Sequence, residues 1–175
     1  MTTGHALTDK LRGWFTGRLP KGLYEGPPEV TVDREEITVI GRIPAPETGE
    51  GASEVERSAA VAGRIKEFRE RTRHARIEVA AEAEHAFGRK VSWGVRCGDT
   101  VQMFTTLSVP VMTRLRQSER QLLDTLVNAG VARSRSDALG WCVRQVGEHA
   151  ETWLAELREA MRTVEQVRDA GPDLG

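Results

Sequence analysis

The feature that most constrains the fold is a short strand pattern with no partner strand near it. Residues 111–115, VMTRL, alternate in polarity, and two helix patterns follow them instead of a second strand. A lone strand leaves its backbone amide and carbonyl groups unpaired, which is costly once the strand is even partly buried. The sequence therefore predicts that a second copy of the chain supplies an antiparallel partner across a two-fold axis.

The two helix patterns span residues 118–129 and 135–149. Ser118 is a natural N-cap for the first helix, and Gly130 stands at its expected left-handed C-terminal position. The sequence SRSD, Ser134 to Asp137, forms a capping box that opens the second helix. The predicted dimer core combines one side of the strand with the apolar sides of both helices, namely Val111, Thr113, Leu115, Leu123, Leu126, Leu139 and Val143.

This stretch resembles the ribbon-helix-helix family, the MetJ/Arc class of dimeric bacterial DNA-binding proteins. The matching motifs are the alternating VMTRL, the helix LLDTLVNAGVA and the helix opening SRSDAL, and the resemblance covers residues 107–148. It implies a homodimer whose two-stranded ribbon enters the major groove of duplex DNA. The resemblance places base reading at Met112, Arg114 and Arg116, the last where the family often has proline. It places phosphate binding at Arg133, Ser134, Arg135 and Ser136.

These arginines also have simpler explanations. Arg114 and Arg116 could be charges on a solvated strand edge, where they discourage aggregation. Arg133 and Arg135 could be exposed charges in a turn before an ordinary helix cap. Both explanations stay open at this point.

A second basic segment, RIKEFRERTRHAR at residues 64–76, places Arg69, Arg73 and Arg76 on one side of a helix. It could be another phosphate-contacting face. We favour a solvated helix surface, because Glu67 and Glu70 dilute the positive charge.

The expected fold class is α+β. Residues 1–104 predict a small α+β domain of unassigned role, residues 105–150 a ribbon-helix-helix-like DNA-binding and dimerisation domain, and residues 151–175 an amphipathic C-terminal helix and a tail. The elements expected in the first domain are a helix at 6–18, a hairpin within 29–44, a linker at 44–52, a long helix at 54–87 and strands at 90–97 and 101–109. Ser53 and Glu56 form the capping box of the long helix, and a break is expected near residues 72–76.

Composition narrows the functional classes. The net charge of −1 gives no broad positive field for indiscriminate nucleic-acid binding, although residues 111–146 hold six arginines against three acids. No apolar run approaches the ~20 residues of a membrane helix, and the N-terminus does not have the pattern of a secretory signal. The two cysteines, Cys97 and Cys142, lie far apart, which indicates reduced thiols in a cytoplasmic protein.

The sequence contains no histidine or cysteine pair at zinc-ligand spacing, no P-loop and no dinucleotide-binding motif. We therefore expect no metal, no cofactor, no catalytic residues and no enzymatic activity. The leading functional hypothesis is a homodimeric transcriptional regulator or nucleoid-type protein that binds double-stranded DNA, with a protein partner or further assembly at the N-terminal domain. The alternative is a dimeric scaffold or accessory factor that uses the strand and helices only for assembly. RNA binding carries less weight, because no stacking motif is found on the expected strands.

Overall fold

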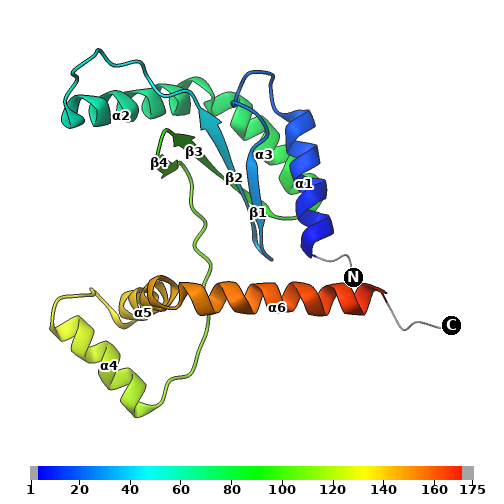
Figure 1. Ribbon diagram of the computed structural model, residues 1–175. Helices are drawn as coiled ribbons and strands as arrows, with labels where there is room; N and C mark the ends of the chain where they lie inside the picture. The colour runs from blue at the N-terminus through cyan, green and yellow to red at the C-terminus, as the bar shows by residue number, and fades with distance from the viewer. Residues whose placement is uncertain (1–3, 171–175) are drawn as a thin grey trace. The chain divides into compact units, whose positions relative to one another are not determined.

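The computed structural model describes residues 4–170, and the chain divides after Pro110 into two compact units (Figure 1). We call residues 1–110 the N-terminal unit and residues 111–175 the C-terminal unit. The predicted mixed α+β class is confirmed, with six helices and one four-stranded sheet in the described residues. The predicted domain boundary between residues 104 and 105 lies close to the junction of the two units. The predicted tail beyond residue 170 lies outside the described residues.

A four-stranded sheet forms the centre of the N-terminal unit. Its strands lie in the order β1-β2-β3-β4, and they are β1 (Glu29–Val32), β2 (Glu36–Ile43), β3 (Lys90–Cys97) and β4 (Thr100–Met103). The outer pairs are antiparallel hairpins, whereas the central pair of β2 and β3 is parallel. A parallel pair needs a long crossover connection, and two helices provide it here.

The first hairpin turns at Asp33 without the Asn-Gly pair that most often marks such a turn. The Asp33 carboxylate accepts hydrogen bonds from the backbone N–H groups of Glu35 (2.9 Å) and Glu36 (2.7 Å). These two bonds hold the pKa of Asp33 below its ordinary value, since they stabilise the charged carboxylate. The predicted hairpin is therefore confirmed, and an aspartate side chain closes its turn.

The crossover consists of α2 (Glu54–Arg71) and α3 (Arg73–Phe87), which are separated only by Thr72. Ser53 caps α2 by accepting a bond from the Glu56 N–H at 3.2 Å, as its capping box predicted. The Thr72 hydroxyl donates to the Phe68 carbonyl at 2.7 Å and is buried there. The predicted long helix is thus two helices, and the expected break falls at Thr72.

The core of this unit lies between the sheet and its helices. The helix α1 (Gly4–Arg18) contacts β1, and both crossover helices contact β3. The largest fully buried side chains are Phe15, Phe68, Leu11, Ile37, Ile65, Val39, Val79, Val95 and Cys97. Aromatic rings extend this core, because Phe15 meets Trp14 and Trp93 edge to face at 4.9 and 5.9 Å.

Two strand predictions differ from the structure. The expected strand 101–109 ends at Met103, after which the Phe104 N–H donates to the Trp93 carbonyl (2.7 Å) and the Phe104 ring enters the core. Residues 105–116 form neither helix nor strand, so the expected strand 111–115 is absent from the single chain. The reason is that the four strands of the described residues pair only with one another, so no strand within residues 4–170 completes a ladder with it.

The C-terminal unit is helical. It contains α4 (Gln117–Asn128), α5 (Arg135–His149) and α6 (Glu151–Ala170), which agree with the predicted helices within two residues at each end. The helices α4 and α5 pack on each other, and α5 contacts α6. Among the described residues of this unit, Leu123, Ala132 and Ala138 form the buried part of a small core.

Gly41 provides a test of the packing in the N-terminal unit. A Cβ atom on Gly41 would lie 2.1 Å from the Tyr24 ring, which stacks on Phe68 with ring centroids 5.6 Å apart. We expect Gly41→Ala to lower the free energy of unfolding by about 1–3 kcal/mol, because the ring must move out of its packed position. Urea denaturation followed by tryptophan fluorescence measures this change.

The matched control is Gly63→Ala, on α2, where nothing lies within 4 Å of the added atom. Alanine in a helix interior is preferred over glycine, so this variant should raise the stability by about 0.5–1 kcal/mol. Equal effects of the two substitutions would contradict the close approach of Tyr24 to β2.

Candidate functional site

The candidate site predicted from the sequence lies in the C-terminal unit, around the turn between α4 and α5. Gly130 takes a left-handed conformation (φ 76°) after α4, as predicted, and its N–H donates to the Val127 carbonyl at 3.0 Å. The chain then reverses through residues 131–134, and the buried Ala132 anchors the turn beneath both helices. This turn sets the position of the predicted phosphate-binding residues at the start of α5.

Ser134 caps α5 as predicted, but the reciprocal bond of a capping box is made to Arg133, one residue before the cap. The Ser134 hydroxyl accepts a bond from the Asp137 N–H (3.2 Å), and the Asp137 carboxylate accepts a bond from the Arg133 N–H (3.0 Å). The first bond satisfies an amide group that a helix start leaves free, and the second satisfies the amide of the residue before the cap. The Asp137 carboxylate therefore occupies part of the amide-rich position at which a phosphate was expected.

Arg135 makes a fork-shaped ion pair with Asp124 on α4. Its Nε and Nη2 atoms lie 2.6 and 2.7 Å from the two carboxylate oxygens, and both side chains are exposed. The hydrogen bond from Arg135, followed by its charge, lowers the pKa of Asp124, and the same bond raises the pKa of Arg135. Arg135 thus links α4 to α5, and its charge is already balanced.

The other predicted contact residues are free of such pairs. Arg114, Arg116 and Arg133 are exposed, and no carboxylate in the described part of the chain forms an ion pair with them. Met112 is 98% exposed. The structure therefore brings Arg133, Ser134, Arg135 and Ser136 together at one helix start and leaves the base-reading candidates on a segment without regular structure.

The end of that segment is fixed to α4. The Arg116 N–H donates to the Glu119 carboxylate at 2.5 Å, and the Arg120 guanidinium donates to the Leu115 carbonyl at 2.6 Å. The N-cap of α4 is consequently Arg116, two residues before the predicted Ser118. Glu119 and Arg120 were not predicted to contribute here, although an acid three residues after a helix start is a recognisable capping signal.

The predicted dimer core is only partly buried in the single chain. Leu123 is buried within the unit, and Leu115, Leu126 and Leu139 are half-buried around it. Val111 and Val143 are 86% and 66% exposed. Further apolar side chains are exposed on the same unit, namely Leu122, Val131, Val146, Trp153, Leu157, Met161, Val164 and Val167.

Other kinds of site find no support among residues 4–170. No group of three or more histidine, cysteine or acidic side chains there is arranged to hold a metal ion. Of the described helices, none is long and apolar enough to cross a membrane. Cys97 is buried, which raises the pKa of its thiol.

The geometry defines an α+β protein of two units. The N-terminal unit is a four-stranded sheet with a helical crossover, and the C-terminal unit consists of the capped helices α4 and α5 followed by α6. Two family models match the chain, and their limits follow the two units. The model described as "Rv1265-like protein, N-terminal domain" matches residues 9–103, and the "Mb1296 C-terminal domain" model matches residues 116–168. The chain therefore belongs to the Rv1265-like protein family.

Mycobacterial relatives agree with this assignment. The proteins Mb1296 of Mycobacterium bovis and Rv1265 of Mycobacterium tuberculosis are each 57% identical to the chain over 161 residues, which is 92% of this chain and 70% of each relative. No solved structure matches the chain. The names of these relatives carry no statement of a ligand or an activity.

The prediction that residues 107–148 belong to the ribbon-helix-helix family was wrong. The family model that matches this part of the chain is the Mb1296 C-terminal domain, which begins at residue 116, after VMTRL, and continues through most of α6. The resemblance rested on three short motifs. Two of them are accounted for by local helix caps, at Gly130 and at Ser134, which many unrelated helix pairs share.

The ion pair between Asp124 and Arg135 leads to a prediction about pH. We expect Asp124→Asn to destabilise the C-terminal unit at neutral pH, because it removes the carboxylate that holds α5 against α4. The folded-state pKa of Asp124 is lowered, so the stabilisation is present above the ordinary aspartate pKa of about 3.9 and is lost as the pH falls through the lower folded value. The difference between wild type and variant should therefore disappear in acid.

Thermal unfolding of both proteins from neutral to acidic pH checks this prediction, with Glu159→Gln as the control. Glu159 pairs with Arg162 one turn along α6, so its loss leaves the contact of α4 with α5 intact. A difference that persists unchanged at acidic pH would show that the carboxylate charge is not the cause.

Proposed function

We propose that the protein is a homodimer that binds duplex DNA through its C-terminal unit. The observation that carries the proposal is the segment 106–115, which has exposed apolar and basic side chains and no backbone partner. Among the described residues, no backbone-to-backbone hydrogen bond involves this segment. Two of its backbone groups are bonded to side chains, since the Leu107 N–H donates to Glu36 (3.2 Å) and the Leu115 carbonyl accepts from Arg120 (2.6 Å). The backbone groups between them, at residues 108–114, are free to pair with the same segment of a second copy.

Apolar exposure supports the dimer. Val111 is 86% exposed although it lies in the alternating pattern, and Val143, Val146 and Leu122 are each more than half exposed on α4 and α5. The core of the unit contains only three buried residues. Packing a second copy against these side chains would remove apolar surface from water, at about 25 cal/mol per Å² buried.

Charge supports the DNA partner. Pairing of residues 111–115 across a two-fold axis would give a ribbon of the size that the major groove accepts, with Met112 and Arg114 on one face. Arg114, Arg116 and Arg133 have no ion-pair partner in the described part of the chain, so their charges are available to phosphates or base edges. Arg135 contributes less, because Asp124 already neutralises it. On this proposal the protein works in the cytoplasm, at the bacterial nucleoid.

A second candidate is a dimeric scaffold or accessory factor of a larger complex. The observation that favours it is α6, whose exposed apolar side chains Trp153, Leu157, Met161 and Val164 recur at helical spacing. Asp124 and Asp137 also reduce the positive charge at the start of α5. Failure to bind duplex DNA at low salt, together with a stable dimer, would favour this candidate.

The oligomeric state tests the first part of the proposal. We expect sedimentation velocity to give a mass near twice 19.4 kDa for the wild type, and a monomer for Val111→Asp. Val111 is already exposed in the single chain, so an aspartate there costs little unless a second copy covers it.

The matched control is Val55→Asp, because Val55 is 79% exposed at the start of α2. This variant should remain dimeric. A monomeric wild type, or a Val111→Asp variant that dimerises as strongly as the wild type, would refute the pairing of this segment.

DNA binding is tested by fluorescence anisotropy with a labelled duplex over a series of salt concentrations. We expect the affinity of the wild type to fall as salt rises, with a slope of about 0.9 in log–log terms for each phosphate contact. The double substitution Arg114→Ala/Arg116→Ala should weaken binding by about 1–3 kcal/mol or more, since it removes a potential base contact in each copy.

Arg158→Ala/Arg162→Ala is the control, because it removes the same two charges from α6, outside the proposed interface. It should bind like the wild type. Binding that is absent at low salt, or equally weakened in both variants, would overturn the DNA part of the proposal and leave the dimer standing.

A further inference from the structure

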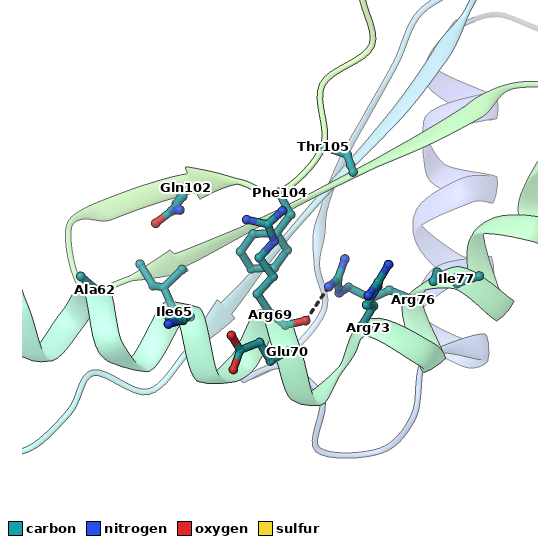
Figure 2. A pocket seen from close by; sticks show the side chains of 11 residues that line it. Ala62, Ile65, Arg69, Glu70, Arg73, Arg76, Ile77, Gln102, Phe104 and Thr105 are labelled. Carbon is teal, nitrogen blue, oxygen red and sulfur yellow. Dashed lines mark hydrogen bonds between the residues drawn. The ribbon is translucent and has the colours of Figure 1, made fainter.

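A pocket of about 850 Å³ lies in the N-terminal unit, where the junction of α2 and α3 faces the end of β4 (Figure 2). We call it the arginine pocket. Its volume falls in the range of pockets that hold small organic ligands. All of its lining residues belong to the N-terminal unit, so none of the residues proposed to contact DNA lines it.

The arginine pocket carries a large excess of positive charge. Its lining includes four basic side chains, Lys66, Arg69, Arg73 and Arg76, and one acidic side chain, Glu70. The formal charge of the lining is therefore +3, in a protein whose net charge is −1. No ion pair within residues 4–170 involves any of the three arginines.

Arg76 is the most constrained of these groups, because it is only 6% exposed. Its Nε donates to the Thr72 hydroxyl at 3.0 Å and its Nη2 donates to the Arg69 carbonyl at 2.8 Å. Both acceptors are neutral, and they use two of the five N–H groups of a guanidinium. Burial, together with the charges of Arg69 and Arg73, lowers the pKa of Arg76, although an arginine still remains protonated.

The ring of Phe104 holds two of these cations in place. The guanidinium carbons of Arg76 and Arg69 lie 4.8 and 5.8 Å from its centroid. Figure 2 shows Arg69 extending over the Phe104 ring, with Arg73 and Arg76 beside it. Cation–π contacts position the charges without neutralising them.

A purely structural role explains only part of this arrangement. Arg76 braces the break between α2 and α3 through its bonds to Thr72 and to the Arg69 carbonyl. That role needs neither the side chain of Arg69 nor that of Arg73. The gathering of three like charges raises the electrostatic energy of the pocket, and an anion would lower it.

The sequence pattern favoured a solvated helix surface for these three arginines, and for Arg76 the structure shows otherwise, because Arg76 is buried. The uncharged walls of the pocket combine the polar Gln102 and Thr105 with apolar side chains. The apolar side chains include Ile65, which is buried in the core, and Ile77, which is 56% exposed. A ligand that fits this lining combines a strongly charged anionic group with a less polar part.

We propose that the arginine pocket binds a small organic molecule through its phosphate or diphosphate group. Planar guanidinium groups match the oxygen geometry of phosphate and bind it in a two-pronged manner. Three arginines match the charge of a diphosphate better than that of a single carboxylate. In this proposal Arg69 and Arg73 contact the outer phosphate oxygens, and Arg76, which lines the pocket beside Phe104, adds the N–H groups that Thr72 and the Arg69 carbonyl leave unused.

Isothermal titration calorimetry of the full-length protein with pyrophosphate tests this inference, since pyrophosphate represents the charged group alone. We expect the wild type to bind, and Arg73→Ala to bind about tenfold or more weakly, because the variant loses a charge-assisted hydrogen bond to the phosphate. The Arg73 side chain makes no hydrogen bond or ion pair within residues 4–170, so this variant should fold normally. Circular dichroism verifies that.

The matched control is Arg57→Ala, which also removes one arginine but from α2, about 18 Å along the helix axis from Arg69. This variant should bind pyrophosphate like the wild type. A second variant, Arg76→Lys, keeps the charge and loses the fork geometry, and it should also weaken binding.

Several results would overturn the proposal. Absence of pyrophosphate binding at low salt would do so, as would equal weakening by Arg73→Ala and Arg57→Ala. Equal affinity for pyrophosphate and citrate would show a general anion site rather than a phosphate site. Displacement of pyrophosphate by a short DNA duplex would identify the arginines as part of a nucleic-acid surface instead of a small-molecule pocket. Duplex binding that Arg73→Ala leaves unchanged supports a site separate from the DNA interface.

Discussion

The parallel pairing of β2 with β3 is the contact on which the N-terminal unit depends. It aligns eight residue pairs, from Glu36 with Lys90 to Ile43 with Cys97. Because parallel neighbours cannot be joined by a tight turn, the chain must cross over, and α2 and α3 form that crossing. The crossing buries Ile65, Phe68 and Val79 against the sheet and brings the arginines at the helix junction beside Phe104. The same crossover, formed by α2 and α3, therefore produces both the core of this unit and the arginine pocket.

Much of the fold follows from local sequence signals. Alternating apolar residues predicted the first hairpin, the Ser53 box predicted the start of α2, and glycine at position 130 predicted the end of α4. Such signals act over a few residues and are therefore visible in the sequence. The length of β4 was overestimated, since Phe104 leaves the strand to enter a core built from residues distant in the chain.

The candidate sites show where sequence reasoning stops. The start of α5 was located, but the pairing of Arg135 with Asp124 joins residues eleven positions apart on two helices, and no local pattern announces it. The same holds for Arg76. Its guanidinium lies over the ring of Phe104, which directly follows β4 and is distant from Arg76 in the sequence. The assignment to the ribbon-helix-helix family from three short motifs failed for a related reason. Helix caps depend on local geometry, so unrelated proteins share them.

The single residue between α2 and α3 has a consequence for how this family can vary. Thr72 lets the two helices change direction while the Arg76 side chain reaches back seven positions to the Arg69 carbonyl. Each inserted or deleted residue would turn the following helix by about 100° around its axis. Length changes in this stretch would thus carry Arg73 and Arg76 away from Phe104. Related proteins that retain the pocket can vary the side chains outside its lining, but they must keep the same number of residues between α2 and α3.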